Sequence, residues 1–230
     1  MKKTEISILI PTRNEVKNIG KLILEILDEL KDYKIEIIVV DDSSEDGTAD
    51  LVKKVTKKHR EVRLIRCLSE PDLGKSILMA VNAAKGEYIV GMDADFNHHP
   101  KHLKSLVEKC DEDTMIVGSR FVSGGGMDLK LRYWLSLFFN AWLKLFLHFP
   151  ICDNTSGYYC ISRKDLISLK PKKIYFGYGE YFIRLVAFAK KSGMKIVEVP
   201  VYYPKRTGGT SKSKFFKMLL TYSKVANDVK

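Results

Sequence analysis

The stretch EYIVGMDAD, which begins at Glu87, most constrains how this chain can fold. Residues 88–92 form a short apolar run typical of a buried strand, and the run ends in two carboxylates, Asp93 and Asp95. In open α/β sheets, ligands bind at the carboxyl ends of the strands. Hard cations such as Mg²⁺ or Mn²⁺ prefer oxygen ligands and often share them with substrate phosphates. We therefore predict an α/β fold with a Mg²⁺ or Mn²⁺ ion at Asp93 and Asp95. The alternative is a pair of loop acids that cap the helix introduced by Pro100.

Strand-like and helix-like segments alternate through the first half of the chain. Apolar side chains recur at helical spacing between Ile19 and Leu30, which predicts an amphipathic helix there. We expect strands at residues 6–10, 35–40, 63–68, 88–92 and 114–117, and helices at about 16–31, 46–59 and 101–110, with another ending near 85. Such alternation is typical of a mostly parallel sheet covered on both faces. Right-handed crossovers would gather Pro11, Asp42 and Asp93 along one edge of that sheet.

Two further polar stretches follow predicted strands, and each has a purely structural alternative. Thr12 and Glu15 have the spacing of a capping box. Asp42, together with Ser43 and Asp46, could cap the next helix. Neither stretch carries the Gly-x-Gly-x-x-Gly of a dinucleotide fold or the glycine and lysine spacing of a P-loop. A Rossmann dehydrogenase and a P-loop kinase are therefore disfavoured.

Composition and charge narrow the class of protein. At 230 residues and 45% hydrophobic content, the chain can bury the core of a single domain with a small appendage. The formal net charge of +11 favours anionic partners, namely nucleotides, phospholipid surfaces or nucleic acid. The cysteines show neither Cys-x-x-Cys pairing nor zinc spacing, so we expect reduced thiols in a cytosolic protein.

The motifs taken together resemble those of glycosyltransferase family 2. The first three are Pro11-Thr12-Arg13-Asn14-Glu15, Val40-Asp41-Asp42-Ser43-Ser44-x-Asp46-Gly47-Thr48 and Met92-Asp93-Ala94-Asp95. Later stretches are similar to those of the dolichol-phosphate mannose synthases within this family: Gly118-Ser119-Arg120-Phe121, Lys130-Leu131-Arg132, Asp153-x-x-Ser156-Gly157-Tyr158 with Arg163, and Arg206-x-x-x-x-Ser211-Lys212. The resemblance covers nearly the whole chain, and the ordered set is specific although each piece is short.

The resemblance implies a fold and a reaction. The fold would be a single nucleotide-diphospho-sugar-binding domain of the GT-A type over residues 1–204, including an interfacial amphipathic helix at 128–150. A basic loop and an amphipathic helix would follow at residues 205–230. The reaction would be an inverting, metal-dependent transfer of mannose from GDP-mannose to dolichyl or polyprenyl monophosphate.

The resemblance also assigns residues to roles. The nucleotide would contact Pro11, Thr12, Arg13, Glu15, Val40, Asp42, Asp93 and Ala94. The metal would be held by Asp93 and Asp95. The catalytic group would comprise Asp95 and four cations around the phosphates of donor and acceptor, namely Arg120, Arg132, Arg206 and Lys212.

Three departures from the family pattern concern the donor. The family often has Tyr at the position of Arg13, Gln or Ser at that of Asn97, and Gly-Glu at that of Gly209-Thr210. These differences leave the base and the sugar open more than the class of reaction. A UDP-sugar donor, carrying glucose or N-acetylglucosamine, is therefore the alternative.

This chemistry explains the residue types. A metal held by two carboxylates neutralises the charge that develops on a leaving diphosphate, and fixed cations add stabilisation at the same place. A lipid monophosphate is largely ionised near neutral pH, since its second pKa is about 6. Such a nucleophile needs guanidinium groups to orient it rather than a strong general base.

A polar stripe marks the apolar helix expected at residues 131–149. Its members recur every fourth residue: Arg132, Ser136, Asn140, Lys144 and His148. A central lysine costs about 3 kcal/mol in a bilayer, so we expect an interfacial helix with its stripe facing the site rather than a spanning one. The alternative is a helix buried against the domain's own core.

The charge of the tail favours attachment to a membrane surface. Residues 205–230 are rich in lysine and have an apolar face, so we expect peripheral association with the cytoplasmic face of a membrane. A solvated basic face is the alternative, and attachment through a small membrane subunit stays open. A nucleic-acid-binding module would explain the net charge but leaves Asp93 and Asp95 without a role, so nucleic acid is not the expected partner.

Overall fold

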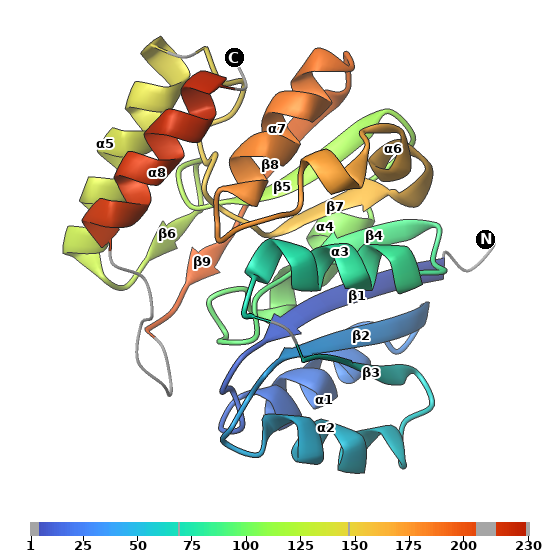
Figure 1. The fold of residues 1–230 in the computed structure, drawn as a ribbon. Coiled ribbons are helices and arrows are strands. Elements are labelled where there is room, and N and C mark those ends of the chain that lie inside the picture. Colours follow the sequence, from blue (N-terminus) through green and yellow to red (C-terminus); the bar gives the residue numbers. More distant parts are fainter. Residues whose placement is uncertain (1–4, 69, 147, 206–214, 229–230) are drawn as a thin grey trace.

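The computed structural model of the protein describes residues 5–68, 70–146, 148–205 and 215–228. Seven strands form one sheet in the order β3-β2-β1-β4-β7-β5-β8 (Figure 1). Their bounds are β1 Glu5–Thr12, β2 Lys34–Asp42, β3 Val62–Cys67, β4 Tyr88–Gly91, β5 Thr114–Ser119, β7 Tyr159–Ser162 and β8 Lys195–Pro200. Neighbouring strands pair in parallel except β7, which runs antiparallel to both β4 and β5. The expected mostly parallel α/β sheet is confirmed.

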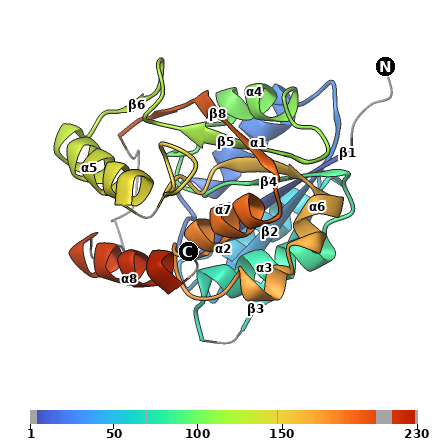
Figure 2. The same ribbon diagram turned by 90° about the horizontal axis from the view of Figure 1, so that it is seen from above.

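Helices cover both faces of the sheet (Figures 1 and 2). The helices are α1 Ile19–Glu29, α2 Thr48–Thr56, α3 Leu73–Ala83, α4 Leu103–Val107, α5 Lys130–Phe146, α6 Arg163–Ser168, α7 Tyr181–Lys191 and α8 Phe215–Asp228, with short 3₁₀ turns at Pro100–His102 and Pro171–Lys173. Successive side chains of a strand point to opposite faces, so Ile8 and Ile10 of β1 pack with α1 and α4, whereas Leu9 packs with α3 and α7. The sheet therefore lies between two apolar cores, one on each of its faces.

The helices are shorter than the sequence periodicity predicted. The helix expected at residues 16–31 begins at Ile19, because Asn14 has a left-handed φ of 54° and the following residues form a loop. The one expected at 101–110 opens as a 3₁₀ turn and ends at Val107. The positions of the five predicted strands agree with the structure to within two residues at each end, and β1, β2 and β5 continue two residues beyond their predicted ends.

Two helices and a small sheet stand at one end of the main sheet. Helices α5 and α8 lie side by side there (Figures 1 and 2), and the rings of Phe139 and Tyr222 are 6.5 Å apart between their centroids. Strands β6 (Gly126–Met127) and β9 (Tyr202–Tyr203) pair in parallel nearby. Among the described residues, no helix is both long and apolar enough to cross a membrane.

Candidate active site

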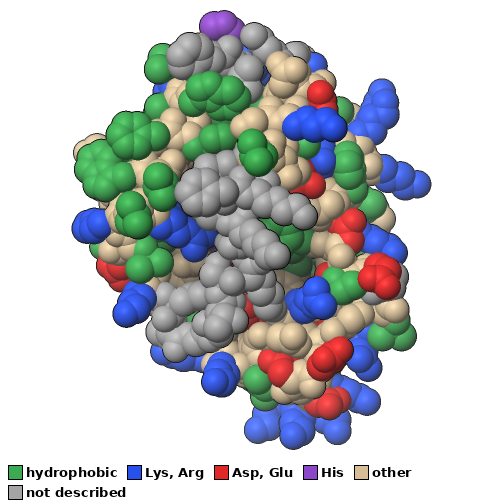
Figure 3. Space-filling view, turned by 60° about the vertical axis from the view of Figure 1, so that its left-hand side comes forward, with side chains coloured by type: hydrophobic (Ala, Val, Ile, Leu, Met, Phe, Trp, Pro, Cys, Tyr) green, Lys and Arg blue, Asp and Glu red, His purple; other side chains and the backbone are tan. Residues whose placement is uncertain are grey.

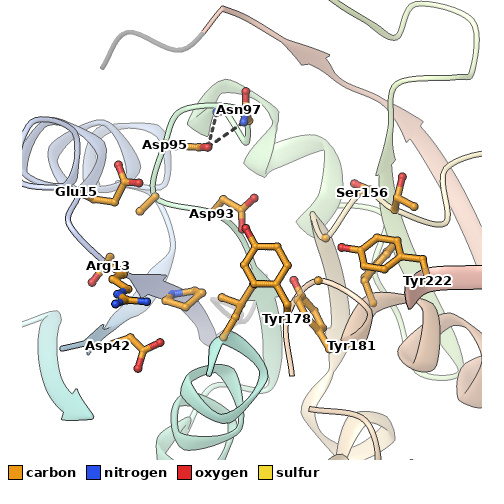
Figure 4. A pocket seen from close by; sticks show the side chains of 18 of the residues that line it. Arg13, Glu15, Asp42, Asp93, Asp95, Asn97, Ser156, Tyr178, Tyr181 and Tyr222 are labelled. Carbon is orange, nitrogen blue, oxygen red and sulfur yellow. Dashed lines mark hydrogen bonds between the residues drawn. The ribbon is translucent and has the colours of Figure 1, made fainter. Parts of the chain in front are cut away.

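A cavity of about 420 Å³ lies where β1, β2 and β4 end. Figure 4 looks into it, with Arg13 and Asp42 on one side, Asp93 near the centre and Tyr222 on the other side. Most residues singled out from the sequence line this cavity: Pro11, Thr12, Arg13, Glu15, Asp42, Asp93, Ala94, Asp95, Arg120 and Arg132. Val40 does not, because it is fully buried in the core beneath α3. Arg206 and Lys212 lie outside the described residues.

The cavity has two walls of different construction. The strand-end wall consists of residues 11–13, 15, 42 and 93–95, which end or follow β1, β2 and β4. The helix-and-loop wall consists of residues 120, 132, 136, 155–157, 178, 179, 181, 182 and 222, which come from α5, α7, α8 and the loops between strands.

Hydrogen bonds between neighbouring loops shape the strand-end wall. The amide of Asn14 donates to Ser44 Oγ at 2.8 Å, and the amide of Glu15 donates to Thr48 Oγ1 at 2.9 Å. The Asp46 carboxylate accepts from the amide of Thr48 at 3.0 Å, but the N-cap of α2 is Gly47, which has no side-chain cap bond. The Thr12 hydroxyl does not accept from the amide of Glu15 as in a capping box, because that amide donates to Thr48 Oγ1; the hydroxyl donates to the carbonyl of Val40.

Asp42 projects into the cavity with an unsatisfied carboxylate oxygen. The residue is 6% exposed, and within the described residues its Oδ1 has no hydrogen-bond partner. Burial raises the pKa of the Asp42 carboxyl, and the charge of Arg13 acts in the opposite direction. This oxygen is itself buried, so a ligand in the cavity that donates a hydrogen bond would remove the cost only if the Asp42 side chain turned towards it.

Asp93 and Asp95 stand on a tight turn after β4. Phe96 has a left-handed φ of 64°, which brings Asn97 back over Asp95. Both carboxylate oxygens of Asp95 then accept hydrogen bonds from Asn97, one from its amide at 3.1 Å and one from Nδ2 at 2.9 Å (Figure 4). A bulky residue with positive φ is an unusual, strained conformation of the kind concentrated at functional sites.

The oxygen atoms of this turn suit a hard cation. Asp95 is 6% exposed, whereas the Asp93 side chain is 44% exposed and faces the cavity. Mg²⁺ binds through one or two carboxylates and takes its other ligands from substrate phosphates and water. Among the described residues, no three His, Cys, Asp or Glu side chains gather as a metal cluster. The two carboxylates of this turn are the oxygen ligands that the described residues could offer a hard cation.

Arg120, in the helix-and-loop wall, forms a buried ion pair with Asp153. Its Nε and Nη2 donate to the two carboxylate oxygens of Asp153, at 2.8 and 2.7 Å, and Nη2 also donates to Thr155 Oγ1. Burial alone would lower the pKa of Arg120, but the adjacent Asp153 carboxylate raises it above its ordinary value. The Arg120 charge is thus permanent and already paired, which limits it to its remaining N–H groups as a phosphate ligand.

The polar stripe of α5 contacts the loop that precedes β7. Asn140 accepts from the amide of Asn154 at 2.7 Å and donates to Thr155 Oγ1 at 3.0 Å. Lys144 donates to Cys152 Sγ at 3.1 Å. Arg132 and Ser136 of the same stripe line the cavity. The polar side of α5 is therefore held against residues 152–155, the loop before β7. This contact also orients the helix so that Arg132 faces the cavity.

Aromatic residues complete this wall and were missed by sequence reasoning. They are Tyr178, Tyr181 and Phe182 at the start of α7 and Tyr222 of α8. A Cβ at Gly179 would overlap the Tyr222 hydroxyl, so only glycine fits beneath that side chain. Burial raises the pKa of both Tyr181 and Tyr222, which keeps their hydroxyls protonated. The one signal in the sequence was the run FGYGEYF, in which glycines alternate with aromatic residues.

Sequence comparison places the chain among known proteins. The family described as Glycosyl transferase family 2 matches residues 7–169. The dolichol-phosphate mannosyltransferase of Pyrococcus furiosus is 30% identical over 215 residues, which are 91% of this chain and 59% of that protein. The dolichol-phosphate mannosyltransferase of Saccharomyces cerevisiae is 28% identical over 90% of this chain and 80% of its own length. The undecaprenyl-phosphate mannosyltransferase of Micrococcus luteus is 27% identical over 89% of this chain and 85% of its own.

Structural comparison confirms the GT-A fold. The glucosyl-3-phosphoglycerate synthase of Mycobacterium tuberculosis, crystallised with Mn²⁺ and UDP-glucose, matches 99% of this chain and 80% of its own with a TM-score of 0.69 and 18% identity. The mannosyl-3-phosphoglycerate synthase of Rubrobacter xylanophilus matches 98% of this chain and 73% of its own with a TM-score of 0.65 and 16% identity. At these identities the similarity concerns the fold alone.

Proposed function

The chain belongs to glycosyl transferase family 2 and is a glycosyltransferase; from that premise we propose that it transfers mannose, with inversion, from GDP-mannose to dolichyl or polyprenyl monophosphate. Relatives from an archaeon, a yeast and a bacterium support the proposal, because each is named as a mannosyltransferase of a polyprenol phosphate. The chain spans 59% of the length of the archaeal relative. The activity of that whole protein therefore enters here as a proposal.

The observation that carries the proposal is one cavity with two unlike walls. The strand-end wall presents Asp42, Asp93 and Asp95, which suit a nucleotide diphosphate with its metal. The helix-and-loop wall presents Arg132 from a helix whose outer side is apolar and exposed. A nucleotide sugar and a lipid phosphate could therefore meet in a single space.

We assign Asp93 and Asp95 as the residues that hold Mg²⁺ or Mn²⁺. The bound ion would neutralise charge on the leaving diphosphate without a proton transfer. Asn97 fixes the Asp95 carboxylate by two hydrogen bonds, so its oxygens are oriented before the donor binds. Asp93, more exposed, faces the middle of the cavity, where the diphosphate would lie.

Asp42 favours guanine over uracil in this proposal. Guanine presents N1–H and its amino group side by side, and one carboxylate can accept both, whereas uracil presents one N–H. The buried Oδ1 of Asp42 lacks a partner among the described residues. Pairing a buried, charged acceptor contributes about 1.5–3 kcal/mol. We therefore expect GDP to bind about ten-fold or more tightly than IDP, which lacks the amino group, and Asp42→Asn to abolish that difference.

Arg132 is the residue we assign to the acceptor phosphate. A guanidinium matches phosphate bidentately and keeps its charge at all physiological pH values. Arg120 holds the adjoining loop through Asp153 and can add an N–H to the same anion. No general base is needed, because the phosphate oxygen is already ionised.

We propose that α5 rests on the cytoplasmic surface of a membrane. Leu131, Trp134, Phe138 and Leu145 are 75%, 53%, 68% and 68% exposed, and hydrophobic side chains gather on that face of the molecule in Figure 3. Arg132 stands between two of these residues and lines the cavity. A polyprenyl chain could thus stay in lipid while its phosphate enters the cavity.

The reaction is tested with purified protein, Mn²⁺, radiolabelled sugar nucleotides and dolichyl monophosphate in detergent. We expect label to enter lipid from GDP-mannose, and EDTA to abolish the transfer. Transfer from UDP-glucose or UDP-N-acetylglucosamine but not GDP-mannose would overturn the assignment of the donor. Arg132→Ala should lower turnover far more than it weakens GDP binding, and equal activity would remove its role.

Membrane attachment is tested by flotation with vesicles that contain phosphatidylglycerol. The unsubstituted protein should float at low salt, and Leu131→Ser with Phe138→Ser should reduce the floating fraction. Leu24→Ser is a matched control, because Leu24 is 52% exposed but lies on α1. A protein that stays wholly in the soluble fraction would overturn direct attachment.

A further inference from the structure

His98 lies behind the cavity and contacts both of its walls. The side chain is fully buried and does not line the cavity. Its Nδ1 accepts a hydrogen bond from the backbone amide of Asp93 at 2.8 Å. Its Nε2 is 3.0 Å from the carbonyl oxygen of Ser156. One imidazole ring therefore connects the turn of the two carboxylates with the loop of the helix-and-loop wall.

These two contacts fix the tautomer of the ring. An amide N–H donates to Nδ1, so that nitrogen carries no proton. The proton of the neutral ring is then on Nε2, which donates to the Ser156 carbonyl. Each nitrogen of His98 thus has a different hydrogen-bond partner, and the two hydrogen bonds can be removed separately, although Nε2 also lies 3.8 Å from the Asp93 carboxylate.

Neighbouring rings prevent His98 from tilting. The Tyr158 ring stacks on it with centroids 4.8 Å apart and an interplanar angle of 14°, and the Tyr203 ring meets it edge-on at 5.2 Å. The Tyr203 hydroxyl donates to the Ser156 carbonyl at 3.2 Å, which holds the same oxygen from a second direction. The distance between Asp93 and Ser156 is therefore set by a rigid, buried spacer.

We propose that His98 is a positioning residue that sets the separation between the sugar donor and the acceptor phosphate. The inference rests on the proposed function, in which Asp93 lies on the donor side and Ser156 on the acceptor side. An in-line displacement requires the reacting atoms to be about 3–3.5 Å apart, and a misplacement of about 1 Å can cost 100-fold in rate. His98 would set this distance by holding the two walls apart, without contacting either substrate.

Two substitutions divide the role of the ring. In His98→Asn, Oδ1 takes the place of Nδ1 and keeps the acceptor for the Asp93 amide, but the donor to Ser156 is lost. In His98→Gln, Nε2 keeps the donor to Ser156, but the Asp93 amide loses its acceptor. The matched controls are His99→Asn and His99→Gln, because His99 is the next residue and its Nδ1 accepts from the amide of Lys101 rather than from either wall.

The test measures GDP affinity by calorimetry with Mn²⁺ and, separately, kcat and KM for geranylgeranyl monophosphate. His98→Asn should leave GDP affinity within about two-fold and lower kcat/KM for the acceptor at least about ten-fold, as is typical when a supporting hydrogen bond is lost. His98→Gln should weaken GDP affinity about ten-fold. Identical profiles for the two variants, or profiles no different from those of the His99 controls, would overturn the proposal.

A second measurement separates this proposal from the proposed function. Nitrogen NMR of the unsubstituted protein should show Nδ1 of His98 as a hydrogen-bond acceptor and Nε2 as a donor before any substrate is added. A proton on Nδ1 would overturn the spacer whatever the substrate. If GDP binds but the sugar is transferred to a different acceptor, the proposed function fails. The comparison of His98→Asn with His98→Gln is then repeated on that acceptor, and identical profiles there would overturn the role of His98.

Discussion

The two walls of the cavity are held in position by different forces. The strand-end wall follows consecutive parallel strands, and the ladder that pairs Thr12 with Asp41 fixes its backbone. The helix-and-loop wall joins residues far apart in the chain through buried side chains, among them Arg120, Asp153 and Asn140. The first wall should therefore tolerate loss of a side chain without moving, whereas the second should lose stability when one polar partner is removed.

Breaking the buried ion pair should have the largest effect. Asp153→Asn leaves Arg120, 5% exposed, without its counter-charge, and removing one partner of a buried pair costs about 3–5 kcal/mol. Urea unfolding measures the change. Arg120→Met combined with Asp153→Asn should recover part of the loss, because no buried charge is left unpaired. A loss below about 1 kcal/mol for Asp153→Asn would contradict the contrast between the walls.

Asp95→Asn should show the opposite behaviour. Sugar transfer should fall at least about 100-fold because a proposed metal ligand is lost. The unfolding free energy should fall by only about 0.5–1.5 kcal/mol, because the amide keeps one of the two acceptor oxygens that bind Asn97 and loses the other. The measurements are initial rates with Mn²⁺ and urea unfolding. Asp50→Asn is the control, on the exposed side of α2. Undiminished transfer by Asp95→Asn would remove the proposed metal site.

Acid should first weaken the contact between the 3₁₀ turn Pro100–His102 and strand β9. Burial, with Lys101 nearby, lowers the pKa of His102 to about 4, and its Nε2 accepts from the amide of Tyr202 at 3.3 Å. The folded pKa lies below the ordinary value, so the stabilisation is present above about pH 6.5 and is lost as the pH falls towards 4. Hydrogen exchange at Tyr202 should rise first, and His102→Gln should remove the dependence.

The smallest effect should come from Thr12→Val. The Thr12 hydroxyl donates to the Val40 carbonyl at 3.3 Å, but the parallel ladder already fixes both backbones. One neutral hydrogen bond contributes about 0.5–1.5 kcal/mol, so stability should fall by no more than that. GDP affinity should be unchanged in calorimetry. A large loss of affinity would show that the hydroxyl, rather than the backbone, forms this part of the wall.

The strand-end wall could be predicted from the sequence because parallel strands bring their carboxyl ends to one edge. Pro11, Asp42 and Asp93 were expected along that edge, and all three line the cavity. Val40 was expected there too, but it lies two residues inside the strand and is covered by α3. Position along a strand decides whether a side chain reaches the edge, and the motif alone does not give that position.

The helix-and-loop wall could be predicted only in fragments. The motifs contained Arg120 and Asp153, but nothing in their spacing indicated that the two side chains would bind one another. Tyr222 enters the cavity because α8 packs against α5 and α7, which no local pattern specifies. Contacts between distant segments depend on tertiary packing, and neither periodicity nor motif spacing records them.

The reversed strand β7 also affects the order in which a growing chain can fold. β5 pairs with β7 and β8, both of which are synthesised after it. On the ribosome, β1 to β4 can assemble early, while Met115 and Val117 wait without a sheet neighbour until residues 159–162 emerge. Uncovered strands of this kind promote aggregation. The strand-end wall can thus form on the nascent chain before the helix-and-loop wall, and a chaperone would help most during that interval.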